Sequence, residues 1–161
     1  MFRVPSRMCQ HRKISQTLSK LAYPSPLFSF ESEGETSLSF KNTINIGTFS
    51  KNHKELNPSP EFTRIFKSTL SSSVYIDPIF RNQAFNFKNG FMHINDQRVQ
   101  NMLYRVNDPQ DIIGMVYVEN GEMVAGTYQD MPTHCLYTND GLFQVPEFTF
   151  NRLVNNMQAS T

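Results

Sequence analysis

The stretch that decides the fold is residues 108–145, DPQDIIGMVYVENGEMVAGTYQDMPTHCLYTNDGLFQV. It contains two strand pairs, each joined by a two-residue turn, at Asn120-Gly121 and at Asp140-Gly141. These dipeptides favour hairpin turns because Asn, Asp and Gly adopt the positive φ values that match the twist of paired strands. The stretch therefore predicts antiparallel hairpins, but it indicates no reaction.

The first hairpin is apolar on both faces. A turn at Asn120-Gly121 pairs Val118 with Met123 and places Glu119 opposite Glu122, so its tip is expected to project into solvent. One face is expected to belong to the core. The second face collects five side chains: Ile113, Met115, Tyr117, Val124 and Tyr128. Because a half-exposed hairpin normally alternates apolar and polar residues, this second face should be covered within the domain or bind a partner.

The second turn, at Asp140-Gly141, predicts another pair of faces. One face holds His134, Leu136, Thr138, Phe143 and Val145. The other holds Cys135, Tyr137, Leu142 and Gln144.

Three segments have the period of amphipathic helices. The first starts at Ser59-Pro60-Glu61, which combines a cap hydroxyl, a proline at the first helical position and a first-turn carboxylate. The second follows Asp96, and the third follows Pro146-Glu147. Their apolar faces are, in chain order, Phe62, Ile65, Phe66 and Leu70; Val99, Met102, Leu103 and Val106; and Phe150, Leu153, Val154 and Met157.

Residues 74–94 are expected to contain no helix. Asp77-Pro78 predicts a turn between two short extended pieces, because a proline restricts the residue before it. Asn89-Gly90 predicts a hairpin that places Phe85, Phe87, Met92 and Ile94 in the core. Together the elements predict an α+β fold: an antiparallel sheet of about 4–6 strands built from β-hairpins, packed with about three amphipathic helices.

Charge divides the chain into two parts. Residues 1–30 carry five Lys and Arg and no acidic residue, whereas the remaining 131 residues carry 10 Lys and Arg against 14 Asp and Glu. A basic, Ser-bearing, acid-free N-terminus is typical of an import presequence, and we expect one over residues 1–30, removed somewhere between about residues 20 and 40. The alternative is a basic tail that binds an acidic partner or a membrane surface.

The domain organisation follows from composition. Residues 31–58 are polar, and their aromatic residues have no consistent period, so we expect an extended arm or linker there. Residues 59–161 are expected to form a single α+β domain. No apolar run approaches the roughly 20 residues of a transmembrane helix.

The sequence carries no recognisable catalytic, cofactor-binding or metal-binding constellation. It lacks phosphate-binding loops, nucleophile elbows and zinc-ligand spacings. His134 and Cys135 are adjacent, and neighbouring residues of a strand point to opposite faces, so they are not expected to act together. Asp108 and Asp111 are most simply turn and strand-edge residues. Enzymatic activity stays open but is disfavoured.

These features favour a protein that works by docking. We expect a non-catalytic accessory subunit or assembly factor of a large mitochondrial complex, with the respiratory chain or ATP synthase favoured, in the matrix or on the matrix side of the inner membrane. Its partners would be protein subunits, with peripheral membrane association only through the complex and no specific small molecule. The candidate interface comprises Ile113, Met115, Tyr117, Val124 and Tyr128 of the hairpin, with Phe28, Phe30, Phe40 and Phe49 of the arm.

Two alternatives remain. A small mitochondrial enzyme or ligand-binding module would be favoured by an enclosed apolar pocket that contains His134 with an acidic neighbour. A mitochondrial ribosomal or RNA-associated protein would need clustered cations, and the net charge of −4 over residues 31–161 (10 positive against 14 negative) argues against it.

Overall fold

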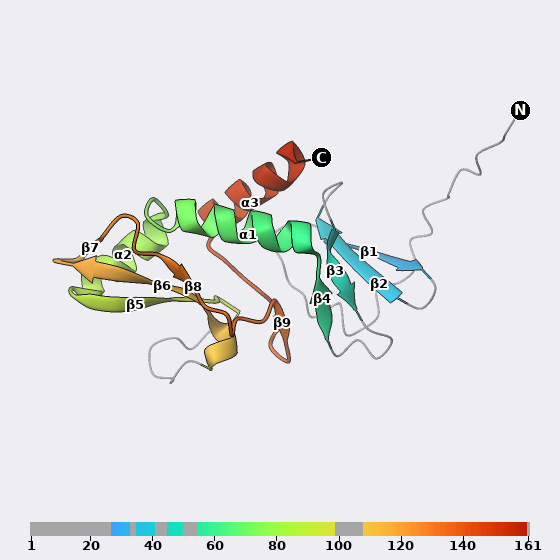
Figure 1. Ribbon diagram of the computed structural model, residues 1–161, viewed down its shortest axis with the longest axis horizontal. Coiled ribbons are helices and arrows are strands. Elements are labelled where there is room, and N and C mark those ends of the chain that lie inside the picture. Colours follow the sequence, from blue (N-terminus) through green and yellow to red (C-terminus); the bar gives the residue numbers. More distant parts are fainter. Residues whose placement is uncertain (1–26, 33–34, 41–44, 50–54, 99–107, 161) are drawn as a thin grey trace, which may run out of the picture.

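The computed structural model describes residues 27–32, 35–40, 45–49, 55–98 and 108–160. Within these ranges the chain forms three α-helices and three antiparallel sheets (Figure 1). The α+β fold predicted from the hairpins and helical periods is confirmed. The helix predicted over residues 99–106 lies outside the described residues.

The N-terminal strands form a four-stranded meander. They are β1 (Leu27–Ser32), β2 (Glu35–Phe40), β3 (Asn45–Phe49) and β4 (Leu56–Pro58), paired in chain order. We expected an extended arm or linker over residues 31–58, and the described part of that range contains strands. The sequence period was obscured by a register irregularity between Leu38 and Ser39, which places three consecutive buried residues in β2.

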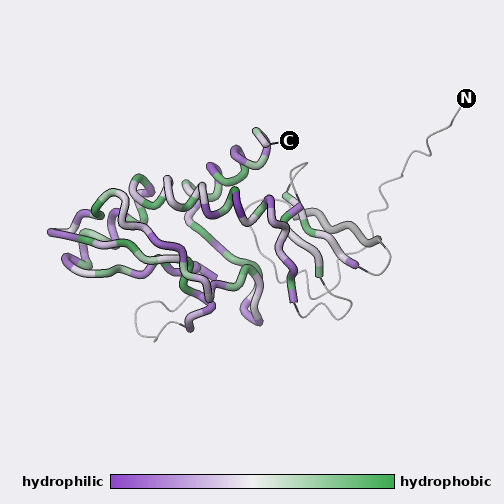
Figure 2. The backbone as a smooth tube through the Cα atoms, in the orientation of Figure 1, coloured by the Kyte–Doolittle hydropathy of each residue, from purple (hydrophilic) through white to green (hydrophobic). Residues whose placement is uncertain are grey.

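The helices α1 (Pro60–Ser73) and α3 (Glu147–Ala159) pack against each other. Their predicted apolar faces are confirmed, with Phe62, Leu70 and Leu153 almost fully buried. Figure 2 shows hydrophobic and hydrophilic residues alternating along both helices, as expected when one face is buried. Phe40 of β2 meets Phe150 of α3 edge to face, with ring centroids 5.2 Å apart, so the meander shares its core with the rest of the chain.

Residues 78–87 form a helix, and the two predictions made for residues 74–94 are wrong in this respect. Asp77 caps α2 (Pro78–Phe87), because its side chain accepts a hydrogen bond of 2.9 Å from the Ile79 amide. The strand β5 (Gly90–Asn95) follows directly. Phe85 and Phe87 therefore lie on a helix surface, 61% and 45% exposed, rather than in the core.

The central sheet contains β5, β6 (Ile112–Glu119), β7 (Glu122–Met123) and β8 (Gln129–Asp130). A short 3-10 helix, η1 (Pro109–Asp111), leads into β6. The predicted turn is confirmed: Asn120 and Gly121 have φ values of 51° and 81°, and Val118 pairs with Met123. The α2 helix packs on one face of this sheet, where Phe80 and Ala84 share a core with buried side chains of β5 and β6.

The last strand pair, β9 (Tyr137–Thr138) and β10 (Gly141–Leu142), turns at Asn139-Asp140. The predicted turn at Asp140-Gly141 is wrong by one residue in each strand. A shift of one residue in both strands leaves the faces unchanged, so Leu136 still lies beside Phe143, whose amide donates to the Leu136 carbonyl at 2.7 Å. Among the helices in the described ranges, none is long and apolar enough to cross a membrane.

Candidate functional site

The second face of the central hairpin is only partly open. Tyr117 is 36% exposed, and Met115 and Val124 are half-buried. Phe91 of β5 pairs with Tyr117 and is 60% exposed, and their rings meet edge to face at 5.1 Å. We call the surface formed by Phe91, His93, Met115, Tyr117 and Val124 the open face.

Two bulges remove the other predicted members of this face. Ile94 pairs with Gly114 and Asn95 with Ile112, so Ile113 is an extra residue in β6 and turns into the core, where it is 3% exposed. If the register at the tip continued, Met115 would pair with Gly126; it pairs with Gln129 instead. A slip by an odd number of residues moves Tyr128 to the opposite face.

Tyr128 is largely buried. Its amide donates to the Tyr75 hydroxyl at 2.8 Å, and its ring lies over Gly114. Burial raises the pKa of Tyr128 well above its ordinary value, and the nearby charge of Asp130 raises it further. It is therefore largely an interior residue of this structure and does not contribute to the open face.

The four phenylalanines of the predicted arm lie in two different places, the shared core and the strand β1. Phe40 and Phe49 are buried in the shared core, so they are not available to a partner in this structure. Phe28 and Phe30 lie on β1. Sequence reasoning did not choose Phe91, although its position one residue after the Asn89-Gly90 turn would have indicated a strand face.

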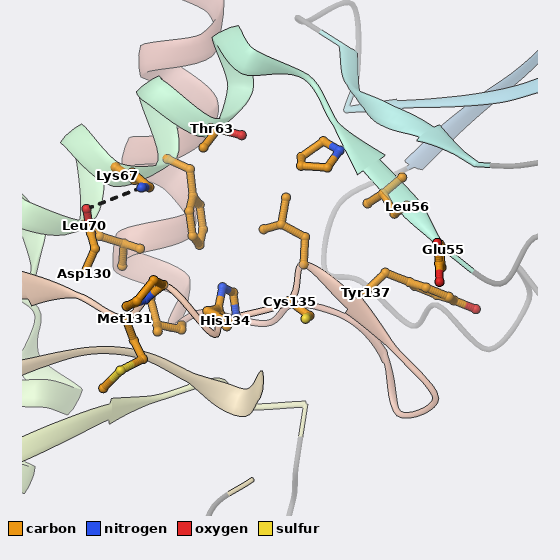
Figure 3. Close-up of a pocket in the computed structure, with 15 residues that line it drawn as sticks. Glu55, Leu56, Thr63, Lys67, Leu70, Asp130, Met131, His134, Cys135 and Tyr137 are labelled. Carbon is orange, nitrogen blue, oxygen red and sulfur yellow. Dashed lines mark ion pairs between the residues drawn. The ribbon is translucent and has the colours of Figure 1, made fainter. Parts of the chain in front are cut away.

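A cavity of about 390 Å³ opens between α1, β4 and residues 130–137 (Figure 3). Its walls are mainly apolar and include Leu56, Pro58, Phe66, Leu70, Met131 and Leu136. Lys67 and Asp130 lie at one end, 3.9 Å apart, Glu55 lies at the other, and His134 lies between them. The cavity has the size of a small-molecule site.

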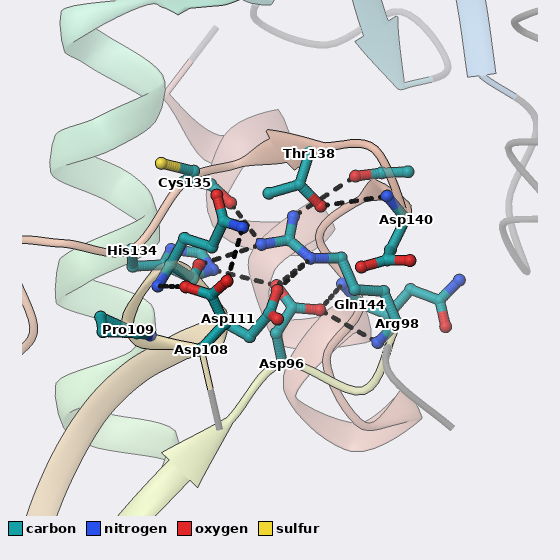
Figure 4. Close-up of polar contacts among 12 residues, drawn as sticks. Asp96, Arg98, Asp108, Pro109, Asp111, His134, Cys135, Thr138, Asp140 and Gln144 are labelled. Atoms are coloured by element: carbon teal, nitrogen blue, oxygen red, sulfur yellow. Dashed lines mark hydrogen bonds and ion pairs between the residues drawn. The ribbon is translucent and has the colours of Figure 1, made fainter. Parts of the chain in front are cut away.

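Next to the cavity lies a buried charge cluster made of Asp96, Arg98, Asp111 and His134 (Figure 4), of which His134 also lines the cavity. The Arg98 guanidinium donates to Asp111 Oδ1 at 3.0 Å and to three backbone carbonyls, at 2.7 to 3.3 Å. These carbonyls belong to Gln110, Cys135 and Gly141. Arg98 thus connects the start of β6 to the hairpin of β9 and β10.

His134 joins the charge cluster to the cavity. Its Nε2 lies 2.9 Å from Asp96 Oδ2, while Asp96 Oδ1 accepts from the amides of Arg98 and Gln144 at 3.1 and 2.8 Å. The imidazole also stacks on Phe66 at 6.0 Å. A carboxylate that accepts from one ring nitrogen fixes the tautomer and leaves the other nitrogen for a ligand.

From the sequence, an enclosed apolar pocket that contains His134 with an acidic neighbour would favour a ligand-binding module; the structure places Asp96 beside His134, at the wall of a cavity that is open to solvent. His134 and Cys135 both line the cavity, because residues 131–136 lie outside any strand and do not alternate as predicted. From the sequence, we expected Asp96 only to cap the helix predicted to follow it. Since 38 residues separate it from His134, no local pattern could have paired them.

Within the ranges that the structure describes, no group of three or more His, Cys, Asp and Glu side chains could hold a metal ion. Asp108 caps η1, and Asp111 belongs to the charge cluster, so neither faces the other as an acid/base pair. Comparison with models of protein families, with curated proteins and with solved structures gives no match.

Proposed function

We propose that this protein is a non-catalytic accessory subunit or assembly factor of a large mitochondrial complex, and that it docks through the open face. The observation that carries the proposal is the exposed pair of Phe91 and Tyr117 on a sheet face opposite α2. Aromatic residues at the centre of a surface patch are the residues that most often dominate binding energy.

The surroundings of the pair support docking. Phe85 and Phe87, at the end of α2, lie near the β6–β7 turn and the start of β5, and both are exposed. Exposed apolar side chains that gather at one end of a molecule mark contact sites more often than isolated ones do. The edge strand β5 also carries no Lys, Arg, Asp or Glu that would discourage pairing with another chain.

The mitochondrial address rests on the acid-free N-terminus. Because β1 begins at Leu27, a processing site that preserves the four-stranded meander would lie before that residue. N-terminal sequencing of the mature protein from purified mitochondria tests this. A mature protein that starts beyond residue 32 would lack β1. If the protein is absent from mitochondria, the proposed mitochondrial location is wrong. The preference for the respiratory chain or ATP synthase rests on the abundance of these complexes in mitochondria.

Docking is tested by native size. The tagged protein is expected to migrate in a complex far larger than its own 18.6 kDa in fractionated mitochondria. The double variant Phe91→Asp, Tyr117→Asp should return it to monomer size while the isolated domain keeps its urea midpoint. Phe148→Asp, which changes another exposed aromatic residue on α3, is the matched control and should leave the complex intact.

Two results would contradict the proposal. The wild-type protein could migrate as a monomer, which excludes a stable complex. The double variant could stay in the complex, which would place the interface elsewhere on the molecule.

A further inference from the structure

The cavity between α1, β4 and residues 130–137 is not used by the docking proposal, and its chemistry can be derived separately. Mainly apolar side chains of α1, β4 and residues 130–137 line it, so burial of an apolar ligand body would supply the main driving force. The polar groups at its surface then decide which apolar molecules fit. These side chains belong to Glu55, Thr63, Lys67, Asp130, His134, Cys135 and Tyr137.

His134 is the best-oriented of these groups. Its side chain is 7% exposed, and Asp96, 0% exposed, holds its Nε2. The amides of Arg98 and Gln144 hold Asp96 in turn, so the imidazole is fixed by two layers of contacts. When the ring is neutral and Nε2–H donates to the carboxylate, Nδ1 is an acceptor, and no described residue donates to it.

The charges around the cavity disfavour a charged ligand. Lys67 is already paired with Asp130, and Glu55 adds a second carboxylate at the other end. An anion would meet both carboxylates. A cation would meet Lys67, and either ion would lose its hydration against apolar walls.

We infer that the cavity binds a neutral, mainly apolar molecule that carries a hydroxyl group, such as a phenol or a long-chain alcohol. The apolar body lies between Phe66 and Leu56, and the hydroxyl donates to Nδ1 of His134. Phe66 stacks on the imidazole, so a flat ring can lie along an aromatic wall that ends at the hydrogen-bond acceptor.

The test compares two probes that differ only in the donor. The full chain is titrated with 4-propylphenol and with 4-propylanisole, its methyl ether, by calorimetry and by protein-observed NMR. The phenol is expected to bind about tenfold more tightly, which corresponds to one buried hydrogen bond. The anion 4-propylbenzoate and the cation 4-propylbenzylammonium are expected to bind more weakly than the phenol.

Two variants locate the site. His134→Gln keeps an amide N–H near the position of Nε2 for Asp96 but removes the acceptor at Nδ1. It should bring the phenol down to the affinity of the ether. Leu56→Trp, which fills the cavity from β4, should abolish binding of both probes, and His93→Gln on the open face is the matched control.

Equal affinity for the phenol and the ether in the wild-type chain would overturn the inference, as would tighter binding of the benzoate. Unchanged phenol binding by Leu56→Trp would show that the probe binds elsewhere. If His134→Gln fails to fold, the comparison of the two probes and the Leu56→Trp variant still decide. None of these outcomes depends on the native size of the protein in mitochondria, so docking and ligand binding can fail separately.

Discussion

Asp77 and Thr149, which are 72 residues apart in sequence, join the helices α2 and α3. Oδ2 of Asp77 accepts from the Thr149 hydroxyl at 2.5 Å and from the Thr149 amide at 3.2 Å. Oδ1 of the same carboxylate accepts from Ile79 and so caps α2. One buried carboxylate thus starts α2 and holds the first turn of α3.

Replacing Asp77 by Ala should destabilise the protein by about 2–4 kcal/mol, because a helix cap and the partner of buried Thr149 donors are lost together. The free energy of unfolding in urea measures this. Asp108→Ala, at the exposed cap of η1, is the matched control and should cost less than about 1 kcal/mol. Equal costs for the two variants would show that the contact with Thr149 contributes nothing.

The positive charge of Arg98 offsets the charges of two buried carboxylates. Its Nε lies 3.7 Å from Asp96 Oδ2 and 3.0 Å from Asp111 Oδ1. Arg98→Met should cost about 3–5 kcal/mol, since it leaves buried charges without a counter-ion. Arg81→Met, on the exposed surface of α2, provides the control and should change stability by less than about 0.5 kcal/mol. A mild effect of Arg98→Met in urea unfolding would mean that water enters the cluster.

Substituting alanine at three glycines would distinguish the free-energy cost of a positive φ from the cost of steric crowding around the added methyl group. Gly126 has a φ of +77°, and a methyl group there would meet nothing within 4 Å, whereas Gly121 has a φ of +81° and a methyl group there would meet the Phe85 backbone at 3.3 Å. A methyl group at Gly114 would lie 2.6 Å from the Tyr128 ring and 2.7 Å from the Gln129 carbonyl.

Alanine at Gly126 should therefore cost about 1 kcal/mol, through φ alone. Alanine at Gly121 should cost more than at Gly126, and alanine at Gly114 should cost at least about 3 kcal/mol, because a backbone atom must move. Urea unfolding of the three variants gives the order. If Gly126→Ala cost more than Gly114→Ala, the backbone conformation would outweigh crowding.

How much of this fold could be predicted depended on whether a signal was local. Ser59-Pro60 and Asn120-Gly121 fix the start of α1 and the central turn through contacts within a few residues, and both were predicted correctly. Asp77-Pro78 carries the same cap-and-proline signal as Ser59-Pro60, but it was interpreted as a turn between extended pieces because a proline restricts the residue before it.

The rest depends on contacts that sequence does not display. The bulge at Ile113 and the slip before Tyr128 each reverse which face a side chain occupies, and no residue type announces them. The strands β2 and β3 are rich in polar residues, and their buried side chains lie in a core shared with α1 and α3. The pairing of Asp96 with His134 exists only in the folded chain.

Tyr128 should make stability depend on alkaline pH. Burial and the charge of Asp130 raise its pKa in the folded state, while the unfolded chain titrates near the ordinary value of about 10. Below that pH the folded and the unfolded states both keep the Tyr128 proton, so ionisation of Tyr128 does not lower the free energy of unfolding. Above it the unfolded state releases a proton that the folded state retains, so stability falls as pH rises, by up to about 1.4 kcal/mol per pH unit.

Tyr128→Phe removes this proton difference. Between pH 10 and 11 the variant should lose about 1 kcal/mol less unfolding free energy than the wild-type protein. Tyr117→Phe, which changes an exposed tyrosine, is the control and should follow the wild-type profile. Urea unfolding at closely spaced pH values measures the slopes. Parallel curves for wild type and Tyr128→Phe would show that the Tyr128 hydroxyl is reached by solvent, and that the slip which turns it away from the open face does not bury it.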